Sequence, residues 1–221
     1  MKPSVAVKII IVIYLVGLLG FTLNLKFGDV TLYQFFSTLT PANIVFSFLI
    51  LLFFHKDWSF RFVIAMLIIA SIGFWVEYLG VKTGLLFGRY SYGSNLGLKF
   101  LDIPVIKGVN WYLLIYCSRA WVQKWVRNPV ILSVLASLIM VIYDYVLEPF
   151  AMNTDLWNWN IGVPPLHNFA GWLLVSLLIH LAYSSSEKQV HNPIAVPLFV
   201  VQFVFFALIG IIKGWLPYIP G

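Results

Sequence analysis

Charged residues are scarce in this sequence. Asp, Glu, Lys and Arg make up 10% of its 221 residues, and hydrophobic residues make up 61%, whereas a soluble domain contains about 25% charged residues. So few polar side chains cannot cover a water-soluble globule, and we therefore expect the chain to lie in lipid. The sequence predicts an integral, multi-pass membrane protein, and the cell inner membrane is its expected location.

The net charge of +6 does not indicate nucleic acid as a partner. The basic residues lie in short loops and at the ends of apolar segments, which is the usual pattern beside membrane helices. No basic face with interleaved aromatic residues is present. We expect the lipid membrane as a partner, and no nucleic acid.

Several signatures of familiar chemistry are missing. Cys117 is the single cysteine, which excludes an intramolecular disulfide. The four histidines are scattered, whereas membrane di-iron hydroxylases and desaturases need short-spaced histidine boxes. No Gly-rich phosphate loop or nucleophile elbow occurs. Lys213 stands at the end of the last apolar segment and not in its middle, so a retinal Schiff base is not expected.

Long apolar runs, by contrast, are abundant. Runs of about twenty residues are long enough to cross a bilayer, and they predict an all-α polytopic bundle of about seven transmembrane helices in a single domain, residues 1–221. The predicted spans are 5–23, 34–54, 62–79, 104–122, 129–148, 167–183 and 194–213. The second is the weakest, because Pro41 and Asn43 interrupt it. No small-residue cleavage pattern follows the first, which we interpret as a retained helix.

Two of the connections, residues 80–103 and 149–166, are long and rich in aromatic side chains. Because successive helices alternate in direction, both connections should open on the same side of the membrane. The ends of the spans that face this side contain eight polar or aromatic candidates: Glu77, Asn110, Trp111, Asp144, Glu148, His167, Asn168 and Trp172. The alternation alone therefore predicts that these side chains converge.

Three of these candidates are acids within membrane spans. Such acids cost a few kcal/mol and usually face the bundle interior with a function, although Glu77 could instead extend to the headgroups. Asp144 and Glu148 are four residues apart on one helical face. One alternative is that Arg89 or Lys82 pairs with them as a structural tie. The other is that the two carboxylates repel in a water-poor site, so that one keeps its proton and can act as a general acid.

The neutral candidates also allow two interpretations. Asn110 and Asn168 should form hydrogen bonds inside the bundle, either to the acids or only between helices. His167 either opens a helix by bonding a backbone carbonyl or acts as a ligand, and a metal site is an alternative built from Glu77, Asp144, Glu148 and His167.

The aromatic residues suit an interfacial belt. Trp157 and Trp159, which alternate in "DLWNWN", could instead line a hydrophobic tunnel or face a developing cation. An acid cluster beside aromatic rings at a lipid-facing site favours proton chemistry on a hydrophobic molecule.

Three segments together resemble the membrane-integral carotenoid hydratase family, which includes the archaeal bisanhydrobacterioruberin hydratases. They are "GFWVEYLGVKTGLLFGRYSYGSNLGLKFLDIPVIKGVNWYLL", "YDYVLEPFAMNTDLWNW" and "GVPPLHNFAGWLL". The family pattern falls on Glu77, Gly80, Phe87, Gly88, Tyr90, Tyr92, Pro104, Trp111, Asp144, Pro149, Trp157, Trp159, Asn168, Gly171 and Trp172. Glu148 departs from the Asp that the family commonly has before the proline.

The resemblance implies addition of water to the terminal double bond of an acyclic carotenoid end, such as that of lycopene or γ-carotene. The product is a tertiary alcohol, and the reaction needs no redox cofactor. Separately, we expect no metal at the site. The expected catalytic residues are Glu77, Asp144 and Glu148, with Asp144 as proton donor and Glu77 polarising the water. The expected substrate-binding residues are Tyr90, Tyr92, Asn110, Trp111, Trp157, Trp159, His167, Asn168 and Trp172.

Two other functions fit the same residues. A carotenoid cyclase also protonates the polyene end, but an internal double bond then captures the cation. A small transporter or lipid-binding membrane protein would use the acids as a proton relay without turning over a carotenoid.

Overall fold

The computed structural model confirms a mainly helical architecture and describes residues 1–23, 26–27, 30–186 and 190–221. The described residues form eight helices, and very short strands lie in some of the connections between them. The helices are α1 (Pro3–Thr22), α2 (Leu32–Thr38), α3 (Thr40–Phe53), α4 (Phe60–Thr83), α5 (Ile106–Val122), α6 (Pro129–Asn153), α7 (Leu166–Ser186) and α8 (Ala195–Ile212). The strands are β1 (Lys26–Phe27), β2 (Val30–Thr31), β3 (Tyr90–Tyr92), β4 (Lys99–Phe100), β5 (Ile103–Pro104) and β6 (Trp157–Trp159).

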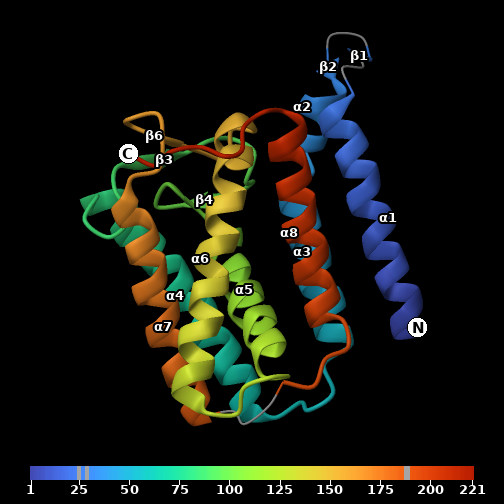
Figure 1. Cartoon of the computed structure of the whole chain (residues 1–221), viewed down its shortest axis with the longest axis vertical. Helices are drawn as coiled ribbons and strands as arrows, with labels where there is room; N and C mark the ends of the chain where they lie inside the picture. Colours follow the sequence, from blue (N-terminus) through green and yellow to red (C-terminus); the bar gives the residue numbers. More distant parts are fainter. Residues whose placement is uncertain (24–25, 28–29, 187–189) are drawn as a thin grey trace.

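The long helices alternate in direction along the bundle (Figure 1). The α4–α5 and α6–α7 connections lie at the end of the molecule where the C-terminus is also found, and the α5–α6 turn lies at the opposite end. β3 and β6, one from each long connection, pair with each other. The prediction that residues 80–103 and 149–166 open on the same side is therefore confirmed.

The number of membrane spans differs from the prediction. Five described helices, α1, α4, α6, α7 and α8, are long and apolar enough to cross a membrane. α2 and α3 would form a sixth span together, although the chain bends by 47° between them. The bend lies just before Pro41, which fits at the start of α3 but lacks the N–H needed to continue α2. The expected count of seven is not confirmed.

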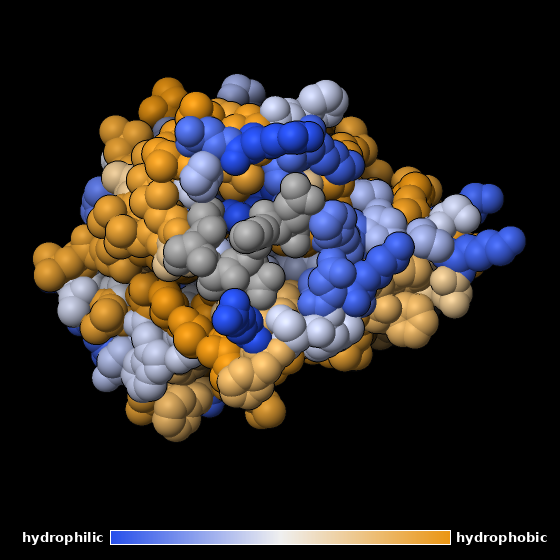
Figure 2. Space-filling view, turned by 90° about the horizontal axis from the view of Figure 1, so that it is seen from below, coloured by the Kyte–Doolittle hydropathy of each residue, from blue (hydrophilic) through white to orange (hydrophobic). Residues whose placement is uncertain are grey.

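α5 is shorter than its predicted span, 104–122, and lies at the centre of the bundle. It has 17 residues, most of them buried, and packs against α3, α4, α6, α7 and α8. The other helices surround it with apolar faces on the outside. Seen from the end opposite the C-terminus, hydrophilic residues gather across the end face and the sides are largely hydrophobic (Figure 2). This surface is that of a membrane protein.

α4 continues beyond its predicted end at residue 79, as far as Thr83. It stops at Gly84, whose left-handed conformation (φ 67°) lets its N–H donate to the Gly80 carbonyl at 2.8 Å. Glu77 therefore lies inside the helix, and its side chain faces the bundle interior.

α6 also continues beyond its predicted end at residue 148, through Pro149 to Asn153. Pro149 has no N–H, which would normally break the helix. Side chains reinforce the final turn, because Asn153 Nδ2 donates to the Pro149 carbonyl, and the Thr154 hydroxyl joins the Thr154 backbone N–H in donating to the Phe150 carbonyl. The extra turn places Glu148 inside the fold, next to β6.

Candidate functional site

A short ribbon covers the end of the bundle where the predicted site residues converge. β3 and β6 pair antiparallel, with Tyr90 opposite Trp159 and Tyr92 opposite Trp157. Alternate residues of a strand point to opposite faces, so these four aromatic side chains are buried while the residues between them are exposed. The two loops that are far apart in the sequence thus form one aromatic cover.

Beneath the ribbon lies a small cavity of about 10 Å³, roughly the smallest volume that holds one water molecule. It contains all three predicted catalytic acids, brought together from α4 and α6. Its lining residues are Glu77, Phe87, Tyr90, Tyr92, Lys107, Asp144, Glu148, Trp157, Trp159, Asn168 and Trp172.

Glu77 is surrounded by four donors. Lys107 Nζ lies 2.9 Å from its Oε1, and Trp111 Nε1 donates to the same oxygen at 2.8 Å. The hydroxyls of Tyr90 and Tyr92 donate to Oε2 at 2.6 and 2.5 Å. An ion pair with three further charge-assisted hydrogen bonds is the environment of an ionised carboxylate. Glu77 therefore does not extend to the headgroups.

The two tyrosines remain protonated in this arrangement. Burial raises the pKa of Tyr90 and that of Tyr92 well above the usual tyrosine value, and the negative charge of Glu77 raises both further. Both hydroxyls therefore act as hydrogen-bond donors to Glu77 across the accessible pH range.

Lys107 is a site residue that the sequence analysis missed. Its side chain is buried, and its ammonium group lies 4.6 Å from the ring centroid of Trp157, 5.6 Å from that of Tyr92 and 5.8 Å from that of Trp172. Three aromatic faces and Glu77 together stabilise the buried charge. The sequence contained one indication that this lysine is buried: in "IPVIKGVNW" it has apolar neighbours on both sides and stands at the start of an apolar helix.

Asp144 and Glu148 share the side-chain amide of Asn168. The amide nitrogen lies 2.8 Å from Asp144 Oδ2 and 3.5 Å from Glu148 Oε1. Glu148 Oε2 accepts from the indole N–H groups of Trp157 and Trp159 at 2.9 and 2.8 Å. Among the described residues, Asp144 Oδ1 has no hydrogen-bond partner. The two acids thus have different surroundings although they lie one turn apart.

Neither acid is tied to the cations that the sequence offered as structural partners. Lys82 pairs with Asp102 at 3.0 Å on the surface, and Arg89 is exposed. In the described part of the chain, Lys82 and Arg89 therefore do not pair with Asp144 or Glu148. The cation in the cavity beside these two acids is Lys107.

Three of the predicted substrate-binding residues lie outside the lining of the cavity. Trp111 stands behind it, stacked on Trp172 with ring centroids 4.2 Å apart, and acts through its hydrogen bond to Glu77. In the described part of the chain, Asn110 and His167 do not line the cavity. His167 is exposed near the start of α7. The role of Asn110 and His167 in substrate binding therefore stays a prediction, and neither residue contributes to the lining of this cavity.

Comparison with known proteins places this arrangement in a family. Residues 33–220 match the family described as carotenoid biosynthesis protein. This chain belongs to the carotenoid biosynthesis protein family. A curated relative, bisanhydrobacterioruberin hydratase from Haloarcula japonica, is 31% identical over 122 residues, which are 50% of this chain and 41% of that relative. The chain thus spans less than half the length of the relative. No solved structure matches.

The metal site considered from the sequence is not assembled in this carotenoid biosynthesis protein. Within the described ranges, no three His, Cys, Asp or Glu side chains are grouped so that they could hold a metal ion. The nitrogen ligand that the alternative required, His167, lies at the surface. The acids are organised instead by Lys107, Asn168 and the indole N–H groups.

Proposed function

We propose that this chain adds water to the terminal double bond of an acyclic carotenoid end, giving a tertiary alcohol. The observation that carries the proposal is the buried pair of Asp144 and Glu148, which share Asn168 beside a cavity lined by aromatic rings. Membership of a carotenoid biosynthesis family and similarity to a protein named as a hydratase support a carotenoid as the substrate.

The first step is protonation by Asp144. Burial away from water and a second carboxyl group one turn away both favour a neutral acid here. The proton passes from Asp144 to the CH carbon of the terminal alkene, whose π electrons form the new C–H bond. The carbon bearing the two methyl groups becomes a tertiary cation. We assign the donated proton to Oδ1, the oxygen without a hydrogen-bond partner among the described residues.

The second step is capture of the cation by water. The water oxygen donates a lone pair to the cationic carbon, and Glu148 accepts the released proton on Oε1, which Asn168 approaches only to 3.5 Å. The proton then returns from Glu148 to Asp144. The substrate gains one water and no electrons are transferred, so the step requires no redox cofactor.

Glu77 has a different role from the one that the sequence suggested. Four donors occupy its two oxygens, which leaves it poorly suited to take a proton from water. We assign it to anchoring Lys107 and the tyrosines of β3. The ring of Trp157 already faces the ammonium group of Lys107, so it is not free to stabilise the carotenoid cation. We assign that role to the carboxylate of Glu148, which is the main stabiliser of the developing positive charge.

The test is expression in a host that accumulates an acyclic carotenoid, followed by mass analysis of the pigments. We expect a product heavier by one water. Incubation of the isolated protein with a preformed, unlabelled carotenoid in deuterated water should place one deuterium on the carbon next to the alcohol carbon. A product of unchanged mass would instead identify a cyclase. Unchanged pigment in a host with confirmed protein would reject the proposed activity.

A further inference from the structure

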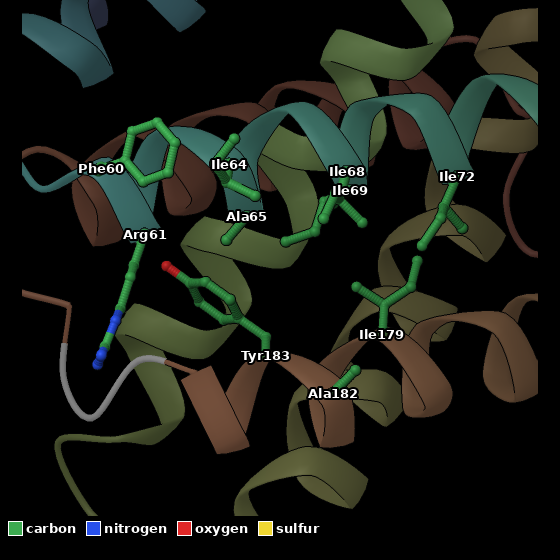
Figure 3. A pocket seen from close by; sticks show the side chains of 10 residues that line it. All are labelled: Phe60, Arg61, Ile64, Ala65, Ile68, Ile69, Ile72, Ile179, Ala182 and Tyr183. Carbon is green, nitrogen blue, oxygen red and sulfur yellow. The ribbon is translucent and has the colours of Figure 1, made fainter.

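A separate apolar groove of about 340 Å³ runs along the outside of the bundle between α4 and α7 (Figure 3). Half of its lining residues are isoleucines, among them Ile64, Ile68 and Ile72 from α4 and Ile179 from α7. Arg61 is the one charged residue in the lining, and it lies at the end of the groove near the start of α4. The interior of the groove therefore suits a hydrocarbon.

The groove has the length and direction of a linear hydrophobic molecule aligned across the bilayer. An α-helix rises 1.5 Å per residue, so the distance along α4 from Phe60 to Ile72 is roughly 18 Å, and the distance to Glu77 is roughly 25 Å. The hydrocarbon core of a bilayer is about 30 Å thick. A long chain lying in the groove would thus have one end at the height of the buried acids.

The two helices that form the groove also form part of the cavity. Beyond the groove, α4 contributes Glu77 and α7 contributes Asn168 and Trp172. A ring from the α4–α5 connection, Phe87, stands at this junction. It also lines the cavity, and its centroid is 6.4 Å from that of Trp172.

Two glycines allow the Phe87 ring to enter between the helices. A Cβ atom on Gly80 of α4 would lie 2.6 Å from the ring, and one on Gly171 of α7 would lie 2.9 Å from it. A larger residue at Gly80 or Gly171 would push the Phe87 ring out from between α4 and α7. Phe87 and Trp172 therefore line the side of the cavity where α4 and α7 meet.

We propose that the α4–α7 groove binds the polyene chain of the substrate while the end of the same molecule reacts in the cavity. This inference rests on the proposed hydration for the identity of the chain. The cavity of about 10 Å³ is far too small for an isoprenoid end, so Phe87 and Trp172 move aside when the end enters. The structure thus describes the closed form, with the binding groove open to lipid.

Two adjacent residues of α4 provide a matched test. Ile68 lines the groove and Leu67 does not, yet their side chains are 53% and 56% exposed. Ile68→Trp fills the groove, whereas Leu67→Trp places the same ring in lipid. Ala65→Phe narrows the groove from a second position. Yield and detergent size-exclusion profiles establish that each variant is folded.

Turnover should be compared for a long acyclic carotenoid and for a short isoprenoid hydrocarbon with the same terminal alkene. We expect Ile68→Trp and Ala65→Phe to lower turnover of the long substrate at least about tenfold and to leave the short one unchanged. Leu67→Trp should match the wild type with both. Wild-type turnover of the long substrate by Ile68→Trp, or equal losses with both substrates, would overturn the groove assignment.

Binding is measured independently of turnover, through the carotenoid that copurifies with the protein and its shifted visible absorption. We expect Ile68→Trp to retain much less carotenoid than Leu67→Trp. If the wild type converts neither substrate but this difference remains, the groove is a carotenoid site and the proposed hydration fails. If Ile68→Trp loses bound phospholipid and keeps carotenoid, the groove is a lipid site and the inference is wrong.

Discussion

Lys107 forms an ion pair with Glu77 inside the bundle, with Nζ 2.9 Å from Oε1 and both side chains about 5% exposed or less. The pair joins the start of α5 to the interior of α4. Removing one partner of a buried ion pair leaves an unpaired charge in a medium of low polarity, which is far more costly than removing both.

We therefore predict that Lys107→Met lowers the free energy of unfolding by about 3–5 kcal/mol, because Glu77 keeps a buried charge without its cation. Lys107→Met combined with Glu77→Gln should recover only part of this loss, because the amide removes the unpaired charge but has one oxygen to accept from Trp111, Tyr90 and Tyr92. Thermal unfolding in detergent measures both variants. A single variant as stable as the wild type would show that the pair contributes little to the fold.

Asp144→Asn should abolish hydration and leave the protein folded. The amide has nearly the same shape, so Asn168 keeps a hydrogen-bond partner at this position, but an amide does not donate a proton to an alkene. Deuterium incorporation into the carotenoid measures the protonation step directly. Glu148→Gln serves as the comparison and should slow product formation. Deuterium incorporation at the wild-type rate by Asp144→Asn would move the donor role to Glu148.

Trp157→Phe and Trp159→Phe should each lower turnover by about tenfold or more without lowering yield. Each variant keeps an aromatic ring and loses one N–H donor to Glu148, and a hydrogen bond to a charged group contributes about 1.5–3 kcal/mol. Trp111→Ala is the contrasting variant: its side chain is fully buried, so yield should fall with activity, as for a core truncation costing about 3–5 kcal/mol. Equal losses of yield in all three variants would show that these rings contribute only to packing.

Asp155 should stabilise the connection between the two long loops in a pH-dependent manner. A backbone hydrogen bond from Ser94, followed by those from the side chains of Ser94 and Asn158, lowers the pKa of Asp155 below its ordinary value of 3.8. Because the pKa is lower in the folded state, the stabilisation is complete above pH 3.8 and is lost as the pH falls through the folded value.

The matched variant is Asp155→Asn, which keeps the shape and removes the charge. It should lower stability by no more than about 1 kcal/mol near neutral pH, because the group is largely exposed and screened by solvent. The difference from the wild type should shrink as the pH falls below 3.8. A difference that stays constant down to pH 3 would mean that the charge of Asp155 does not contribute.

The sequence by itself determined the helical class and the end of the bundle where the site lies. Apolar runs long enough to cross a bilayer predict helices, because a backbone in lipid must satisfy its own hydrogen bonds. Alternating directions then bring Glu77, Asp144, Glu148 and Asn168 to one end, and these four line one cavity. This part needs only chain direction and helix length.

Only the tertiary structure decided which groups contact each other. In the sequence, only its apolar neighbours set Lys107 apart from a flanking lysine. Its burial depends on Trp157, which lies fifty residues away and is positioned by the pairing of β3 with β6. The same holds for Asn110 and His167, whose helices were predicted but which do not line the cavity. A helix predicted from composition has no fixed rotation about its axis, and the packing of its neighbours sets that rotation. The contacts of Glu77 and Asp144 therefore follow from packing, and their chemistry follows from those contacts.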